Sequence, residues 1–252
     1  MRVFFSFLTL LLAPCLLAQN NPGFVGKRHT LGFFAQTAPF HRENRYNAYH
    51  LRAEQTLSRT LTIQASAGFF SHTYNPLIED YKLTFKKDNG AYYPTLFNVV
   101  DIDGNVTIKG KHFQLGLVKY IRKYGSVAPY GKFISLGCFY NSAILSEDNL
   151  IYQLKDNSST RNENISYTTE KSEYKPKHLL GIYAEIGEKR VFKSAFFLQY
   201  SLQCNLPLAL DYYEPEYSYY YNHQDYLEYT MRKIIIRNNV FTAYLGIGFL
   251  LK

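Results

Sequence analysis

The sequence predicts an all-β protein, a closed antiparallel up-and-down transmembrane β-barrel of about eight strands with long external loops. The first reason is that apolar and polar residues alternate with a period of two along eight separate segments, as they do along strands. The second is that each segment has about the length that a tilted strand needs to cross a bilayer. The third is that short connections alternate strictly with long or moderate ones, which sorts the long loops to one end of the barrel.

The first three predicted strands include the clearest hairpin of the chain. A strand is expected over 30–36, and two more over 49–57 and 61–70, which a tight polar turn at 58–60 joins. Alternation on both sides of a tight turn is typical of a β-hairpin. The connection between the first two strands, 39–47, is polar and moderately long.

The remaining five predicted strands follow the same rule. They cover 111–121, 129–140, 179–187, 195–205 and 240–251. The later short turns are 122–127 and 188–193. The long connections, which are rich in turn-forming residues and are expected to be extracellular, are 71–110, 141–177 and 206–237.

One face of the strand 49–57 carries charge. His50, Arg52 and Glu54 recur on the face opposite an apolar one. A membrane barrel turns apolar side chains to lipid and polar ones to its lumen, whereas a soluble sheet does the reverse. We therefore predict a polar cluster in the lumen, composed of His50, Arg52, Glu54, Gln64, Glu185 and Gln199. Eight strands leave an interior just wide enough for side chains to fill, so opposite charges are expected to pair there, with a proton or ion relay as the alternative.

The N-terminus has the features of a secretory signal peptide. Arg2 is followed by an apolar run that ends at Ala18, after which polar residues begin. We predict a signal peptide over 1–18 and one outer-membrane barrel domain over 19–252. A retained membrane anchor and lipidation at Cys15 are the alternatives, but the apolar run is short for a spanning helix.

The layout resembles the small eight-stranded outer-membrane barrels of the OmpX and OmpA type, in the porin-like class of Gram-negative bacteria. The resemblance covers the whole predicted mature chain and rests on the loop pattern and on the last strand, from Phe241 to Phe249. It implies location in the outer membrane and recognition of the C-terminal strand by the barrel assembly machinery. Such barrels usually end in an aromatic residue, whereas this chain ends at Lys252, so Phe249 is expected to serve as the recognised residue.

Histidines are the candidates for chemistry. Some small barrels are enzymes that act on lipid, and the corresponding residues would be Ser71 with His72, His178, and His223 with Asp225. Nucleophilic catalysis needs a base positioned on a nucleophile, and no pairing here is specified by the sequence, so solvated histidines are favoured. No His or Cys spacing matches a metal site. We predict no catalytic residue, no cofactor and no metal.

Tyrosines and basic residues are the remaining features. Tyr219, Tyr220 and Tyr221 lie in the last long connection and form either a recognition surface or an aromatic layer above the membrane. The formal net charge is +8, of which Arg2 contributes one. The basic residues concentrate near the short turns, where they would face lipid headgroups. Nucleic acid is not expected as a partner in this compartment.

The sequence therefore favours a non-enzymatic integral outer-membrane barrel that is monomeric. Its role would be structural or carried out by external loops whose ligand the sequence does not specify, and a narrow pore is left open. The alternatives are a lipid-modifying barrel enzyme and a secreted soluble lipocalin-like barrel, which would need a polar exterior and an apolar interior. Cys138 and Cys204 lie on strands separated by one other strand, so both are expected to be free thiols.

Overall fold

The computed structural model describes most of the chain from residue 27 to residue 251. The described ranges are 27–38, 47–74, 82–84, 97–121, 128–156, 164–168, 172–173, 176–192, 195–210 and 220–251. The predicted signal peptide, the connection 39–46 and the turn 122–127 lie outside these residues.

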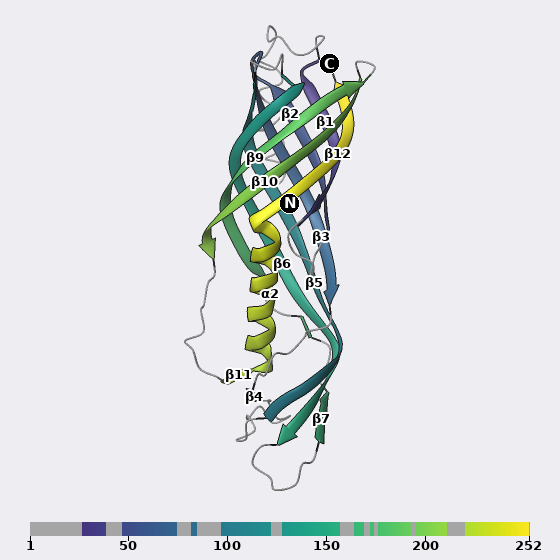
Figure 1. Cartoon of the computed structure of the whole chain (residues 1–252), viewed down its shortest axis with the longest axis vertical. Coiled ribbons are helices and arrows are strands. Elements are labelled where there is room, and N and C mark those ends of the chain that lie inside the picture. Colours follow the sequence, from purple (N-terminus) through teal and green to yellow (C-terminus); the bar gives the residue numbers. More distant parts are fainter. Residues whose placement is uncertain are drawn as a thin grey trace, which may run out of the picture.

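Eight strands form a closed antiparallel barrel (Figure 1). In the order in which they surround the barrel they are β1 (His29–Thr37), β2 (Ala48–Thr56), β3 (Leu61–Tyr74), β5 (Phe97–Tyr120), β6 (Gly131–Asp156), β9 (Lys177–Phe192), β10 (Phe196–Leu210) and β12 (Phe241–Leu251). Each strand pairs with its neighbour along the chain, and pairing of β1 with β12 closes the ring. The predicted fold class and strand number are confirmed.

Further elements lie beyond one end of the barrel, which Figure 1 draws at the bottom and which is called the upper end from here on. They are the short strands β4 (Lys82–Thr84), β7 (Asn164–Thr168), β8 (Ser172–Glu173) and β11 (Tyr220–Asn222), and the helix α2 (His223–Val240). Both β7 and β8 pair with the extended part of β6, while β4 pairs with β5 and, in parallel, with β11. Where the structure describes them, the connections 71–110 and 141–177 extend the barrel wall.

Several strands have boundaries that differ from the sequence prediction, most of all β3, β5 and β6, and β10 also continues to Leu210 in the predicted loop 206–237. The predicted loops 71–110 and 141–177 contain the upper parts of β3, β5 and β6, and β5 and β6 reach 24 and 26 residues. Their pairing continues from Tyr120↔Phe133 to Phe97↔Asp156 with two register shifts. Gly104 lies at one of these bulges with φ of 119°, a backbone conformation that glycine adopts without strain.

Hydropathy changes sign along these long strands, and this explains why their upper parts were missed. In the lower part of β5 the inward residue Gln114 is polar and the outward residue Phe113 is apolar. In its upper part the inward residue Ile108 is buried and apolar, and the outward residue Lys109 is charged. Polar and apolar residues still alternate with a period of two, but the apolar residues move from the outer face to the inner face. In the sequence this change looks like the end of the strand.

The helix α2 is the second correction, because the segment 206–237 was predicted to be a tyrosine-rich loop. Its buried residues Leu227, Met231, Ile234 and Ile235 recur at helical spacing. Three consecutive isoleucines and several tyrosines favour a strand, which concealed this pattern. Within the described part of the chain, no helix is both long and apolar enough to span a bilayer.

One predicted turn is shorter than expected. The segment 188–193 belongs largely to β9, which runs to Phe192, and β10 begins at Phe196. The turn at 58–60 joins β2 to β3 as predicted. Cys138 on β6 and Cys204 on β10 are free and exposed on the outer face, with β9 between their strands. The prediction of free thiols is confirmed.

The barrel turns large apolar side chains outward and polar ones inward. Leu51 of β2 is 56% exposed and Leu136 of β6 is 62% exposed, whereas the adjacent Arg52 and Ser135 are fully buried. Outward apolar residues occur on all eight barrel strands. This polarity is the reverse of that in a lipocalin-like soluble barrel, and it is the polarity that a barrel in lipid requires.

The outward face of β12 provides a test of this polarity. Leu245 lies midway along the strand, and Leu251 lies at its end on the same face. We expect Leu245→Arg to reduce the free energy of unfolding in bilayers by ~2–4 kcal/mol and Leu251→Arg by ~0–1 kcal/mol, because a charge at mid-membrane is costly and one near the interface is not. Urea titration in lipid bilayers measures both. Equal effects would contradict the placement of this face in lipid.

Candidate functional site in the barrel interior

The six polar residues predicted for the lumen all lie in the barrel interior. They are at most 5% exposed and come from β2, β3, β9 and β10: His50, Arg52, Glu54, Gln64, Glu185 and Gln199. Alternation along each strand points them away from the outer face. The barrel brings the first five into two ion-pair networks and an adjoining histidine layer.

The first network is centred on Glu185. Arg52 Nη1 lies 2.8 Å from Glu185 Oε1, across the interior from β2 to β9. The hydroxyl of Ser201 donates to the same carboxylate oxygen, and the Gln64 amide reaches the other oxygen at 3.4 Å. The Arg52 guanidinium also lies 4.6 Å from the ring centre of Phe34. A buried charge is tolerated when it is paired and hydrogen-bonded in this way.

The second network is centred on Glu54. Lys189 Nζ lies 2.6 Å from Glu54 Oε2, and the Tyr120 hydroxyl donates to the same oxygen at 3.1 Å. The Lys189 ammonium lies 4.7 Å from the ring centre of Phe197. Lys189 lies in the segment 188–193, which the sequence predicted to be a short turn. It points inward because it shares a face of β9 with Glu185, and counting in steps of two from Glu185 would have placed it there.

Histidine and amide side chains form the next layer of the interior. His50 Nε2 lies 2.6 Å from the amide oxygen of Gln36, and its Nδ1 lies 3.5 Å from Ser66 Oγ. The His112 ring meets the His50 ring edge-on at 4.8 Å, and the Phe139 ring stacks on His112 at 6.2 Å. These aromatic contacts fix the imidazoles in place.

Close packing around glycines leaves little room for a channel. A Cβ at Gly246 would overlap the Phe34 ring, and one at Gly116 would overlap the Tyr183 hydroxyl. The Tyr183 hydroxyl in turn accepts a hydrogen bond of 2.7 Å from the Gln64 amide. Glycines on the inner face thus make space for large side chains that cross the lumen, as expected for eight strands. Tyr183, Tyr120 and His112 are interior residues that the sequence analysis did not single out.

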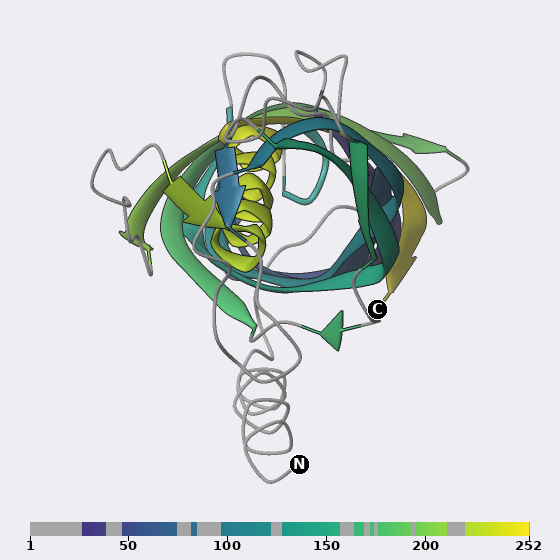
Figure 2. The same cartoon turned by 90° about the horizontal axis from the view of Figure 1, so that it is seen from below.

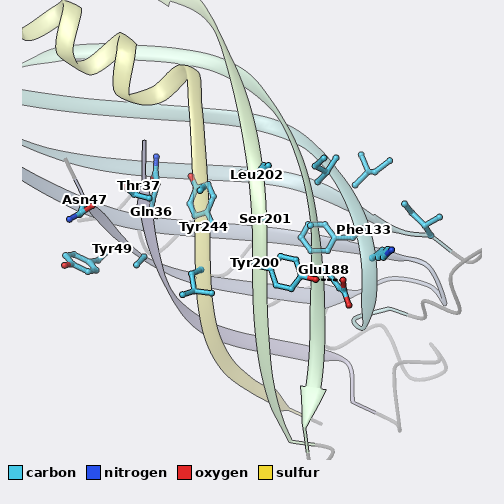
Figure 3. A pocket seen from close by; sticks show the side chains of 18 residues that line it. Gln36, Thr37, Asn47, Tyr49, Phe133, Glu188, Tyr200, Ser201, Leu202 and Tyr244 are labelled. Atoms are coloured by element: carbon cyan, nitrogen blue, oxygen red, sulfur yellow. Dashed lines mark hydrogen bonds between the residues drawn. The ribbon is translucent and has the colours of Figure 1, made fainter. Parts of the chain in front are cut away.

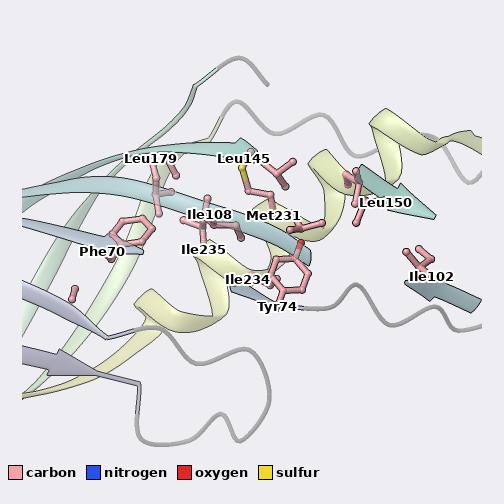
Figure 4. Close-up of a cluster of buried hydrophobic side chains, with 14 of the residues drawn as sticks. Phe70, Tyr74, Ile102, Ile108, Leu145, Leu150, Leu179, Met231, Ile234 and Ile235 are labelled. Atoms are coloured by element: carbon pink, nitrogen blue, oxygen red, sulfur yellow. The ribbon is translucent and has the colours of Figure 1, made fainter. Parts of the chain in front are cut away.

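The helix α2 lies within the ring of strands at the extended end of the barrel, along one side of the interior, as the view along the barrel in Figure 2 shows. Figure 4 shows its Met231, Ile234 and Ile235 packed against residues of the extended strands. Those strand residues include Phe70, Ile108, Leu145 and Leu179, all buried. Burial of apolar side chains from the helix and from four strands forms a hydrophobic core above the polar lumen.

The end of α2 is attached to the barrel wall by amide hydrogen bonds. The Asn205 side chain of β10 donates to the backbone carbonyl of Asn239. The Asn239 side chain donates at 2.7 Å to the carbonyl of Ile235, one turn earlier. The first bond satisfies a carbonyl group that the helix C-terminus leaves unpaired, and both bonds help to fix the passage from α2 into β12.

A depression in the outer wall, shown in Figure 3, is lined mostly by outward-facing residues. The small side chains of Ala35 and Ala243 lie between larger ones such as Leu202 and Leu245. At its edge the Tyr200 hydroxyl donates to the Glu188 carboxylate, which also accepts from Arg190. The depression therefore belongs to the apolar belt of the barrel and not to the interior.

The structure describes the side chains of two of the three histidines that were considered for catalysis, His72 and His178. Ser71 and His72 are adjacent on β3, so their side chains point to opposite faces of the sheet. His178 Nδ1 lies 2.7 Å from the Tyr140 hydroxyl, which is a weak orienting partner. The side chains of His223 and Asp225 lie outside the described residues. In the described part of the chain no three His, Cys, Asp or Glu side chains gather as a metal site.

The predicted loop tyrosines are described only in part. Tyr220 and Tyr221 belong to β11, and Tyr219 lies outside the described residues. Their proposed role in recognition stays a prediction.

No protein-family model matches the chain, and no curated protein matches its sequence significantly. Among solved structures, the N-terminal β-barrel domain of Pseudomonas aeruginosa OprF is similar at 12% identity and a TM-score of 0.34. Two structures of Ail, the attachment invasion locus protein of Yersinia pestis, are similar at 11% and 10% identity with TM-scores of 0.36 and 0.35, the second in complex with the heparin analogue sucrose octasulfate. Each match covers 88% of this chain and 96% of the other. At these scores, the barrel assignment rests on the strand pairing described above.

The Arg52–Glu185 pair generates a stability prediction. Glu185→Gln leaves the buried Arg52 without its carboxylate, and we expect it to cost ~3–5 kcal/mol of unfolding free energy. In the double variant Arg52→Met/Glu185→Gln most of this loss should be recovered, because no uncompensated charge remains. Urea titrations of the single variants and the double variant in bilayers give the coupling free energy between Arg52 and Glu185. Additive effects of the two substitutions would show that the pair is not an energetic unit.

The packing of α2 generates a second prediction. Met231 is fully buried against the extended strands, whereas Tyr229 on the same helix is 36% exposed. Met231→Lys should increase amide hydrogen exchange in the upper parts of β5 and β6 by about tenfold or more, since it buries an unpaired charge. The control Tyr229→Lys should leave exchange unchanged. If exchange also became faster throughout β1 and β12, α2 would stabilise the whole barrel and not only its extension.

Proposed function

We propose that the chain is a non-enzymatic integral outer-membrane protein with a closed lumen. Its role would be structural or carried out by the extension and α2. The observation that carries this proposal is the belt of exposed apolar side chains on all eight barrel strands, which surrounds an interior of buried ion pairs. Only helices and closed barrels satisfy the backbone in lipid, and this barrel is closed by β1 and β12.

The height of the apolar belt fits a bilayer. On β5 the outward residues Leu117, Leu115 and Phe113 lie between Lys119 and Lys111, which are eight residues apart. Eight residues of strand span ~27 Å, or about 20 Å along the barrel axis at a tilt of about 40°. This is close to the apolar band of about 25 Å that outer-membrane barrels have.

A closed lumen is supported at two levels of the interior. The two ion-pair networks cross the lower part of the barrel, and the hydrophobic core with α2 fills the upper part. A narrow pore would need a continuous water-filled path, and the packing of Arg52, Tyr183 and Phe34 around inward glycines opposes one. The geometry favours a membrane anchor for the extension over a transport role.

Orientation, processing and assembly are further parts of this proposal. Short turns would face the periplasm, and the extension with α2 would face outward, as in barrels with long external loops. Removal of residues 1–18 would leave a single barrel domain over 19–252. The assembly machinery would recognise β12 through Phe249, which is exposed on the outer face and packs on Phe196 at 4.9 Å between ring centres. The barrel would act as a monomer in outer-membrane lipid.

Cysteine labelling on intact cells tests location and orientation. In a Cys138→Ser/Cys204→Ser background, Asn105→Cys lies on the exposed face of the extension, and Arg59→Cys lies in the short turn between β2 and β3. A membrane-impermeant maleimide should label the first in intact cells and the second only after the outer membrane is permeabilised. If only Arg59→Cys were labelled in intact cells, the barrel would have the opposite orientation. If neither variant were labelled, the extension would not be exposed on the cell surface.

A further inference from the structure

We propose that the outer wall of β5, at the border between the apolar belt and the extension, binds the phosphomonoester headgroup of an outer-leaflet lipid. The ligand groups are the ammonium groups of Lys109 and Lys111. The inference rests on the proposed function, because it requires the apolar belt to lie in a bilayer. It adds a specific lipid partner that the inside-out polarity does not imply by itself.

The two lysines lie directly above the lipid-facing part of β5. Lys111 precedes the outward residue Phe113 by two positions, and Lys109 precedes Lys111 by two more, so all three side chains share the outer face. Both lysines are exposed. They therefore stand where the hydrocarbon ends and headgroups begin.

Aromatic side chains below the lysines mark this level as an interface. Phe69 of β3 is the register partner of Lys111. The Phe113 and Tyr140 rings lie 6.4 Å apart, and the Tyr140 hydroxyl lies 2.7 Å from His178 Nδ1. Aromatic girdles of this kind lie at the membrane–water interface of outer-membrane barrels. A lipid headgroup that lies on these aromatic rings would be within reach of the ammonium groups of Lys109 and Lys111.

Within the described residues, the two lysines have no acidic partner. Their outward neighbours on the adjacent strands include Ser71, Ser142 and Ile144, none of them acidic. Within the described residues no hydrogen bond or ion pair joins either lysine to another side chain. At the opposite border, by contrast, Lys119 donates to Thr60 at 3.1 Å and Arg190 pairs with Glu188 at 2.8 Å.

Among the described residues, the outward lysines at this border lie in one sector of the barrel. On β1, β2 and β12 the outward residues nearest this end of the barrel are Thr37, Tyr49 and Phe241. None of them carries a charge. Lys109 and Lys111 thus form a localised site on β5. A general attraction to anionic lipid would need no such concentration in one sector.

The spacing of the lysines suits a doubly charged group. Residues two apart on a strand are separated by about 6.7 Å, so two flexible lysine side chains can converge on one phosphate. Lysine binds phosphate as a point charge, and the Ser142 hydroxyl beside it can add a hydrogen bond. A phosphomonoester carries close to two negative charges, whereas a phosphodiester headgroup carries one. The two ammonium groups therefore favour the phosphomonoester.

Native mass spectrometry of the folded protein with three lipids tests the site. The probes are bis-phosphorylated lipid A, phosphatidylglycerol and phosphatidylcholine, added to protein that has first been shown to insert into lipid. We expect lipid A to bind most tightly. The variant Lys109→Gln/Lys111→Gln should weaken its binding by about tenfold or more, because each cation near an anionic surface contributes to binding. Lys109→Arg/Lys111→Arg should retain most of the affinity.

The control removes the same charges at the other border of the same wall. Lys119→Gln/Lys132→Gln should leave lipid A binding unchanged, and equal loss in both variants would reduce the site to non-specific attraction and overturn the proposal. Undiminished binding by Lys109→Gln/Lys111→Gln, or equally tight binding of phosphatidylglycerol, would also overturn it. Failure of the wild-type protein to insert into lipid would instead contradict the proposed membrane function.

Discussion

Backbone hydrogen bonding in lipid is the constraint on which the rest of this structure depends. Hydrocarbon offers no partner for a strand's N–H and C=O groups, so the sheet must close on itself, and here the ladder between β1 and β12 closes it. Closure with eight strands fixes a narrow interior, which side chains then have to fill. Because the outer face takes the apolar residues, the interior receives charged ones, and these are tolerated only as pairs. Arg52–Glu185 and Lys189–Glu54 are the consequence.

Solvent on the outside of the wall determines which side chains lie inside it. Along the apolar belt, where the proposed bilayer would surround the barrel, apolar residues such as Leu115 face outward and polar ones such as Gln114 face inward. Higher on the same strands the exterior is polar, and the inner face changes to Ile108 and Leu145, on which α2 packs. The protein thus has a membrane-type interior below and a soluble-type core above. Lys109 and Lys111 lie at the change from one to the other, which is why they are candidates for a headgroup.

Fold class and lumen composition could be predicted because both depend on a period of two, which a sequence displays directly. The interior position of His50, Arg52 and Glu54 followed from that pattern, and so did the outward position of Cys138 and Cys204. The upper parts of β5 and β6 were missed because the pattern inverts where the solvent changes. The helix α2 was missed because its isoleucines and tyrosines have β-propensity, and its helical spacing matters only once the barrel supplies an apolar surface. The partners of each charge depend on register across the lumen, which hydropathy does not encode.

The central claim is that a filled barrel lies in lipid with its polarity reversed. It is tested most directly by a spin-label scan along β12, from residue 241 to residue 251, in reconstituted membranes. Outward positions should be accessible to dissolved oxygen and shielded from a water-soluble nickel reagent, and inward positions should be shielded from both, with a period of two. Accessibility of the inward positions to the nickel reagent would reveal a water-filled pore. Accessibility of the outward positions to that reagent would show that the apolar belt is not in lipid, and either result would contradict the account.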